Sequence, residues 1–302
     1  MKNLLLILAL SLPSALCAQI LKVGSVEKLS LPDEVYTSIV GISPQGDYVL
    51  LSSKNNKGLV KMNLKNHSTQ TISTASGAGY EVQISPDGNH VVYREDTYTP
   101  AHLRMISLKV TDLTSRQSST LAGPSRDLQG YGINASSATV VTKGKAHTKT
   151  FGAAKTLSAS TILSISNRQL MLTRNGKTSV FSPNGKDYSY IWPSLSPNGK
   201  KALYYVCGNG AYVCNLDGTH IQPLGSIRAP KWYDDNTVVG MNDKDNGEFV
   251  TSSSIVAVSL QGDHQVLTGD SIIAMYPYAN ASGSIITFST PEGNAYIINI
   301  TK

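Results

Sequence analysis

Short apolar runs separated by polar turns recur along the chain, and three of these units share one pattern. The clearest copy is Ile84–Gly88, which reads Ile-Ser-Pro-Asp-Gly and precedes the apolar run Val91–Tyr93. Proline fixes φ for the first central position of a turn, and glycine accepts the positive φ at its end. β-branched and aromatic residues favour strands. Each unit therefore predicts a hairpin between two strands, and the other two copies are Ile42–Gly46 and Leu195–Gly199.

Three weaker copies complete a repeat along the chain. They lack the proline but keep a polar turn before an apolar run. Measured from the first polar residue of each unit, the intervals are 42, 49, 62, 38 and 46 residues. A strand-only repeat of about 40–50 residues is typical of a β-propeller, in which each repeat forms one blade. The first polar residues are Ser43, Ser85, Asn134, Ser196, Asp234 and Asn280.

These units predict an all-β fold, a six-bladed β-propeller with four-stranded antiparallel blades. The last blade contains only three clear strands, at 272–279, 284–289 and 295–300. An additional strand is expected at 20–31, and pairing it with the last blade would remove two free sheet edges. We therefore expect the N-terminal strand to close the ring there. The blades are expected at 35–74, 79–122, 128–182, 188–224, 227–268 and 270–302.

Three segments depart from the regular pattern. Blade 2 has a longer excursion at Arg94–Leu103. In blade 3, Lys143–Thr156 is basic, polar and contains glycine, so it is expected to be a protruding loop. Phe181–Gly185 resembles the repeated turn, but its serine lies only 14 residues before Ser196. It is therefore expected to be the exit from the outer strand of blade 3.

The N-terminal residues are typical of a secretory signal peptide. Lys2 is followed by the apolar stretch Leu4–Leu12 and by small residues that end at Ala18. Cleavage there would remove residues 1–18 and leave one domain, 19–302. The alternative is a lipoprotein signal with Cys17 lipidated, although such signals need a small residue where Leu16 stands. The apolar stretch is shorter than the ~20 residues of a membrane span, so we expect a periplasmic or secreted protein without a transmembrane segment.

The charge of the chain does not indicate a nucleic-acid partner. The formal net charge is +6, but only 15% of residues are charged and the basic ones are scattered. Nucleic-acid binding usually needs a basic patch or stripe. We expect a monomer with a solvated surface.

The Ser-Pro-Asp-Gly unit followed by an apolar strand resembles the repeat of TolB-type propellers, which are usually six-bladed. Gly210–Gly218 is similar to the third strand and outer turn of that family. The resemblance covers most of residues 19–302 and is best in blades 1, 2 and 4. It implies an exported, non-enzymatic scaffold that binds a partner at one mouth of its funnel. About 17 residues separate Ala18 from blade 1, and the α/β domain that precedes the propeller in TolB does not fit there.

Catalytic and metal-binding patterns are sparse. The sequence has no Gly-x-Ser-x-Gly nucleophile turn, and Ser85–Gly88 is one residue short of a sialidase-type Asp box. Asp243–Glu248 has acidic residues at i and i+2 before a glycine, as calcium loops do, but Ser254 stands where an EF-hand needs glutamate. The histidines are spread over separate blades. We expect no catalytic residue, no metal and no cofactor.

Aromatic residues precede the repeated turns, on what should be the innermost strands. These strands line the funnel of a propeller, where amphipathic aromatic side chains could form a platform for a ligand or a peptide. The alternative is that they pack between blades near the axis. The predicted funnel residues are Tyr80, Glu81, Tyr131, Trp192, Lys231, Trp232, Tyr276 and Tyr278.

Cys207 and Cys214 remain after cleavage and flank one hairpin turn. A turn at Gly210-Ala211 would place them opposite each other and allow a disulfide. A turn at Asn209-Gly210 would make them diagonal neighbours and leave two free thiols. Export to an oxidising compartment favours the disulfide.

The leading hypothesis is an exported, non-catalytic propeller that binds a protein or cell-envelope partner at the funnel mouth. One alternative is an enzyme of the lactonase or lyase type with a metal in the funnel, for which the inner strands offer Glu81, Asn134 and Lys231. Another is a glycan-binding module that uses the funnel aromatics. Because one propeller architecture carries many functions, the site has to decide among them.

Overall fold

The computed structural model describes residues 19–32, 37–151 and 161–301, and every helix or strand assigned in these ranges is a β-strand. The predicted signal peptide, residues 1–18, lies outside the described residues. Within those same ranges the structure contains no helix with the length and apolar character needed to cross a membrane.

The repeated turns fold through the side chain of their serine. The Ser85 hydroxyl accepts the N–H of His90 at 2.9 Å, and Gly88 donates its N–H to the Ser85 carbonyl with its own φ at 75°. Ser43 and Ser196 accept backbone N–H groups in the same way, each at 2.9 Å. All three serines are buried. The buried hydroxyl thus fixes the hairpin that joins the first two strands of a blade.

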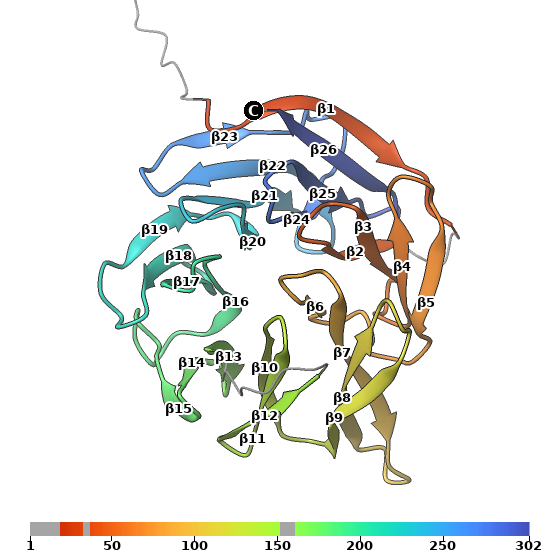
Figure 1. Cartoon of the computed structure of the whole chain (residues 1–302). Coiled ribbons are helices and arrows are strands. Elements are labelled where there is room, and N and C mark those ends of the chain that lie inside the picture. The colour runs from red at the N-terminus through yellow and green to blue at the C-terminus, as the bar shows by residue number, and fades with distance from the viewer. Residues whose placement is uncertain (1–18, 33–36, 152–160, 302) are drawn as a thin grey trace, which may run out of the picture.

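Six antiparallel sheets form a ring, so the protein is a six-bladed β-propeller, as the repeat predicts (Figure 1). The first sheet consists of β2 (Ser38–Ile42), β3 (Tyr48–Ser52), β4 (Leu59–Asn63) and β5 (Thr69–Ser73). The second consists of β6 (Gln83–Ile84), β7 (His90–Tyr98), β8 (Arg104–Asp112) and β9 (Ser118–Ser125). The fourth consists of β16 (Tyr190–Leu195), β17 (Lys201–Val206), β18 (Gly210–Asn215) and β19 (Gln222–Gly225). The fifth consists of β20 (Arg228–Trp232), β21 (Thr237–Asp245), β22 (Val250–Ser259) and β23 (His264–Val266).

The third sheet has six strands rather than the four predicted for 128–182. Its two three-stranded halves meet at one residue pair, Lys145 and Lys177. Both halves bring their first strand to the axis, and β13 contacts both β10 and β16. Seven inner strands in six sheets therefore surround the axis. The strands of this sheet are β10 (Leu128–Ile133), β11 (Ser137–Thr142), β12 (Lys145–Thr150), β13 (Ile162–Ser166), β14 (Gln169–Arg174) and β15 (Lys177–Val180).

The loop predicted at Lys143–Thr156 is wrong over its first half. Residues 145–150 form β12, which pairs with β11 over six residue pairs. The side chains of β12 alternate between exposed and half-buried and include no large apolar residue. Such a polar outer strand gives no hydrophobic signal in the sequence. The part of the predicted loop from 152 onward lies outside the described residues.

The ring closes as predicted. The last sheet has the order β1-β26-β25-β24, formed by β1 (Lys22–Leu29), β26 (Ala295–Thr301), β25 (Ile285–Ser289) and β24 (Met275–Ala279). The ladder between β1 and β26 runs from Lys22 opposite Thr301 to Leu29 opposite Ala295. Pairing the first strand with the last removes the edges that an open ring would expose.

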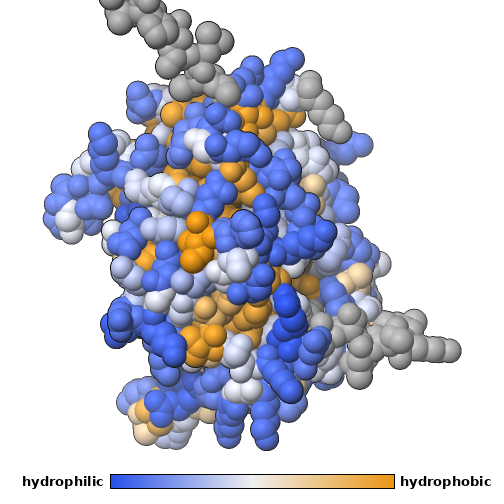
Figure 2. All heavy atoms as spheres, turned by 90° about the vertical axis from the view of Figure 1, so that its left-hand side faces the viewer, coloured by the Kyte–Doolittle hydropathy of each residue, from blue (hydrophilic) through white to orange (hydrophobic). Residues whose placement is uncertain are grey.

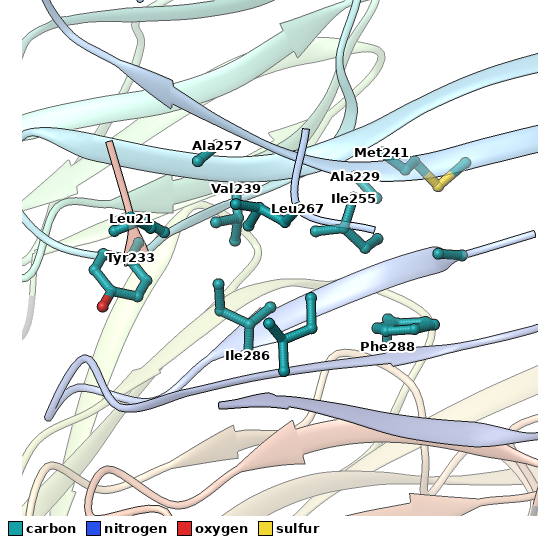
Figure 3. Close-up of a cluster of buried hydrophobic side chains, with 12 residues drawn as sticks. Leu21, Ala229, Tyr233, Val239, Met241, Ile255, Ala257, Leu267, Ile286 and Phe288 are labelled. Atoms are coloured by element: carbon teal, nitrogen blue, oxygen red, sulfur yellow. The ribbon is translucent and has the colours of Figure 1, made fainter. Parts of the chain in front are cut away.

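Apolar residues fill the space between neighbouring sheets. In one cluster, Tyr233 and Val239 of the fifth sheet face Ile286 and Phe288 of the last, and Leu21 covers one end (Figure 3). Because both faces of a blade are buried, its strands read as continuous apolar runs. On the side of the ring that Figure 2 shows, apolar residues are exposed in separate areas among hydrophilic ones.

Candidate functional site

A cavity of about 570 Å³ lies among the inner strands. Its wall includes residues of β6, β10, β13, β16, β20 and β24, so it occupies the axis of the ring. The volume is within the range of ligand pockets, about 300–1,000 Å³. The axial position makes this cavity the candidate functional site.

Four residues of the inner-strand segments adopt positive φ at equivalent positions, each four residues before the turn that ends the strand. Their φ values lie between 46° and 54°, which is unusual for residues other than glycine. In three cases proline follows, and the ladder to the second strand shifts register there. Such a bulge re-aims the side chains that come after it. The four residues are Glu81, Trp192, Ala229 and Tyr276.

The residues two positions after these four all line the cavity. They are Gln83, Ser194, Lys231 and Tyr278, from four different sheets. The bulges therefore give neighbouring inner strands one common level of side chains that face the axis.

Arg94 of β7 anchors one side of the cavity. Its guanidinium is paired with the Glu81 carboxylate and lies 4.8 Å from the ring centroid of Tyr80 and 5.3 Å from that of Tyr131. The Tyr131 hydroxyl donates to the Glu81 carbonyl, and the Gln83 side chain donates to the Tyr131 carbonyl at 2.9 Å. These bonds tie β6 to β10.

Tyr80, Tyr131 and Arg94 are held in their ordinary protonation states at neutral pH. Burial raises the pKa of Tyr131, and the charge of Glu81, with burial second, raises the pKa of Tyr80. Burial disfavours the charged form of Arg94, but Tyr131 and Glu81 outweigh it and raise the pKa of the guanidinium. The two phenols therefore stay neutral hydrogen-bonding groups, and the guanidinium stays charged.

The opposite side of the cavity carries a second cation. The Lys231 ammonium lies 4.9 Å from the ring centroid of Tyr278. Trp192 meets Tyr205 edge to face, with centroids 5.3 Å apart, and exposes part of its ring to the cavity. The site thus combines aromatic walls with separate positive charges.

Solved structures with a similar shape support the fold. One chain of a mitotic checkpoint complex matches with a TM-score of 0.57 at 12% identity, covering 100% of both chains. A putative TolB from Agrobacterium tumefaciens matches with a TM-score of 0.53 at 15% identity, over 88% of this chain and 90% of that one. The fold is that of a TolB-type propeller. An oligogalacturonate lyase in complex with manganese is less similar, with a TM-score of 0.48 at 14% identity over 86% and 76% of the two chains. No protein-family model and no curated protein sequence matches the chain.

The structure brings most of the predicted funnel residues together. Tyr80, Glu81, Tyr131, Trp192, Lys231 and Tyr278 all line the cavity. Trp232 does not, because it packs against the apolar cluster between the fourth and fifth sheets. Tyr276 is 48% exposed and lies outside the cavity wall.

Sequence reasoning missed Arg94, Gln83 and Ser194, which also line the cavity. Arg94 belongs to a second strand, whereas only aromatic and charged residues of first strands were expected at the axis. Gln83 and Ser194 could have been found by counting two residues back from Ser85 and Ser196. The same offset gives Tyr278 from Asn280 but Trp232 from Asp234, so it finds the cavity residue in three of the four bulged strands.

The predicted disulfide is wrong. Both cysteines are free, Cys207 exposed and Cys214 buried. Neither predicted turn forms, because Val206 pairs with Gly210 and the loop is Cys207-Gly208-Asn209. Cys214 lies opposite Ala202, five positions along the strand from Cys207. At about 3.3 Å per residue, the two thiols are much too far apart for a bond.

The calcium-like pattern at Asp243–Glu248 begins inside β21 rather than in a loop. Asp243 is almost fully buried and bound to the Arg228 guanidinium at 2.7 Å, and Asp245 lies 3.8 Å from the same group. Both carboxylates are therefore used in ion pairs within the fifth sheet. Across the described ranges, no three His, Cys, Asp or Glu side chains gather to hold a metal ion.

Proposed function

We propose that the protein is an exported, non-catalytic propeller that binds a protein or cell-envelope partner at the mouth of the axial cavity. The observation that carries the proposal is the cavity itself, in which six predicted residues meet around aromatic walls. Tyrosine and tryptophan supply large contact area and a polar edge, which suits partner recognition. The proposed export is based on the signal-like sequence of residues 1–18.

Two features favour binding over catalysis. The phenols of Tyr80 and Tyr131 have raised pKa values and are weaker acids than ordinary tyrosine. Glu81 is engaged by Arg94 rather than held free as a base. A general acid or base works best with a pKa near the operating pH. The phenols instead offer fixed hydrogen bonds to a bound partner, and the Glu81–Arg94 pair offers fixed charges.

The test is affinity capture from a cell-envelope fraction with immobilised protein of residues 19–302. Tyr80→Ala and Trp192→Ala should each reduce capture of the partner, because they remove cavity wall. Tyr188→Ala is the matched control, since Tyr188 is 42% exposed against 43% for Tyr80 but lies outside the cavity wall. Equal capture by both cavity variants and the wild type would contradict binding at the cavity mouth.

A further inference from the structure

The charged residues of the cavity wall leave one positive charge without a partner. The wall contains three of them, Glu81, Arg94 and Lys231. Glu81 and Arg94 form an ion pair. Among the described residues, no carboxylate lies within 4.0 Å of the Lys231 ammonium, whose neighbour is the face of the Tyr278 ring. The site therefore carries an uncompensated cation.

The backbone places this lysine in the cavity at a cost. Ala229 has φ of 46°, and Pro230 follows it at the register shift of β20. A non-glycine residue in this region is strained and persists only where the surroundings impose the conformation. The bulge sets the direction of the residues that follow, and Lys231 is the cavity residue of this strand. Unlike Arg94, the lysine has no carboxylate from the described residues at the site.

Two hydroxyl groups in the cavity wall add to the unused hydrogen-bonding capacity. Ser164 is only 5% exposed, and its Oγ has no hydrogen-bond partner among the described residues. The same is true of the buried Oγ of Ser194. Ser194 and Lys231 occupy equivalent positions on β16 and β20, which contact each other. Buried donors without acceptors are rare, and a ligand that accepts hydrogen bonds would satisfy them.

We propose that Lys231 and the serine hydroxyls of the cavity wall bind a carboxylate that the partner inserts into the cavity, from an acidic side chain or a C-terminus. This inference rests on the proposed function and adds the chemistry of the recognised group. A single ammonium matches the single negative charge of a carboxylate, whereas a phosphate group carries about −1.5 to −2. Arg94 is already paired with Glu81. Tyr278 and Trp192 supply walls for the apolar stem that carries the carboxylate.

The experiment uses an array of random-sequence octapeptides probed with protein 19–302. Every captured peptide is resynthesised in two forms, one with a C-terminal amide and one with Asn and Gln in place of Asp and Glu. Removing the recognised carboxylate should weaken binding about tenfold or more, which is the usual effect of losing a charge-assisted hydrogen bond. The two forms distinguish a C-terminal from a side-chain carboxylate.

Variants of the protein supply the second arm. Lys231→Met should lose about as much affinity as carboxylate removal, and Lys231→Arg should retain more of it. Lys61→Met is the matched control, because the Lys61 ammonium also lies over a tyrosine ring, 4.5 Å from Tyr48, but outside the cavity. N-acetylglutamate should displace the peptides, and inorganic phosphate should not.

Several results would overturn the carboxylate site. The first is that the array captures no peptide, and the second is that the amide and Asn/Gln peptides bind as tightly as the original peptides. The third is that Lys231→Met binds as tightly as the wild type, and the fourth is that phosphate displaces the peptides while N-acetylglutamate does not. The peptide comparison uses wild-type protein and does not depend on a variant that folds. If envelope capture depends on Tyr80 and Trp192 while any of these results is obtained, the cavity binds a partner but not through a carboxylate. If envelope capture is indifferent to both aromatic residues, the proposed function itself fails.

Discussion

Ala229 shows most clearly how the residue scale shapes the site. Alanine has no polar side chain to stabilise a positive φ, and proline follows it. Trp192 and Tyr276 adopt the same conformation, also before proline. A residue before proline is ordinarily extended, so the sequence gives no reason to expect this geometry. Tertiary packing imposes this conformation. As a result, Lys231, Ser194 and Tyr278 face the axis.

The free cysteines give a prediction at the same scale. In native protein 19–302 under non-reducing conditions, a thiol reagent at pH 8 should modify Cys207 quickly and Cys214 only after unfolding. Cys207 is exposed, whereas burial raises the pKa of Cys214 to about 11 and hides it from the reagent. Mass spectrometry should count one modified thiol in native protein and two in denaturant. A chain with no reactive thiol in denaturant would restore the disulfide hypothesis, and Cys207→Ser serves as the control.

At the scale of elements, the six-stranded third sheet explains the 62-residue interval in the repeat. The turn between β13 and β14 is Asn167-Arg168, with both φ values positive, as in a type I′ hairpin. It contains neither proline nor glycine, so it does not resemble the repeated turn. The hairpins β10–β11 and β13–β14 therefore both lie within the 62-residue interval, but the repeated turn pattern identifies only the first of them.

The close approach of the two halves of this sheet gives a second prediction. A Cβ at Gly130 of β10 would lie 2.6 Å from the Cβ of Ser164 on β13, and that atom cannot rotate away. Gly130→Ala should therefore lower the free energy of unfolding by about 1–3 kcal/mol through overpacking. Gly123→Ala in β9 is the control, because no atom lies within 4 Å of its Cβ.

Urea unfolding followed by circular dichroism measures both variants. Gly123→Ala should change stability by less than about 0.5 kcal/mol. If Gly130→Ala is equally neutral, β10 and β13 do not pack as closely as described.

The elements that the sequence predicted correctly are those with a strong local signal. Ser-Pro-x-Gly turns identified the hairpins β2–β3, β6–β7 and β16–β17, because turn chemistry and apolar runs agree there. β12 was missed because its residues are polar, and the register at Cys207 was missed because the three-residue turn competes with Asn-Gly. Trp232 shows the limit for the site, since one residue of register separates a cavity position from an interface between blades.

At the scale of the whole molecule, stability depends on closing the ring with β1. Leu21, just before this strand, and Leu29, at its end, are buried, whereas Val26 between them is exposed. The side chain of Gln265 in β23 accepts the N–H groups of Ile20 and Leu21, both at 2.7 Å, and donates to the Leu21 carbonyl at 2.8 Å. β1 is thus held by its own sheet and by the neighbouring one.

Loosening this strand should destabilise the entire domain. The double variant Leu21→Ala/Leu29→Ala should lower the melting temperature by roughly 10 °C, since each buried leucine contributes about 2–5 kcal/mol. Val26→Ala is the control within the same strand and should leave the melting temperature nearly unchanged. Differential scanning calorimetry measures both melting temperatures. Equal values for the two variants would contradict the claim that closure by β1 stabilises the domain.

The antiparallel pairing of β1 with β26 also decides how the ring responds to mechanical force. Lys22 faces Thr301, so a force that pulls these residues apart loads the ladder at one end only. Hydrogen bonds loaded one pair at a time unzip at low force, whereas a sheared ladder resists with all its bonds together. The bonds from Gln265 brace Ile20 and Leu21 at the end where unzipping would begin. Tension along the chain would therefore act first on the bonds of Gln265 and then on the pairs between β1 and β26, one after another from Lys22 and Thr301.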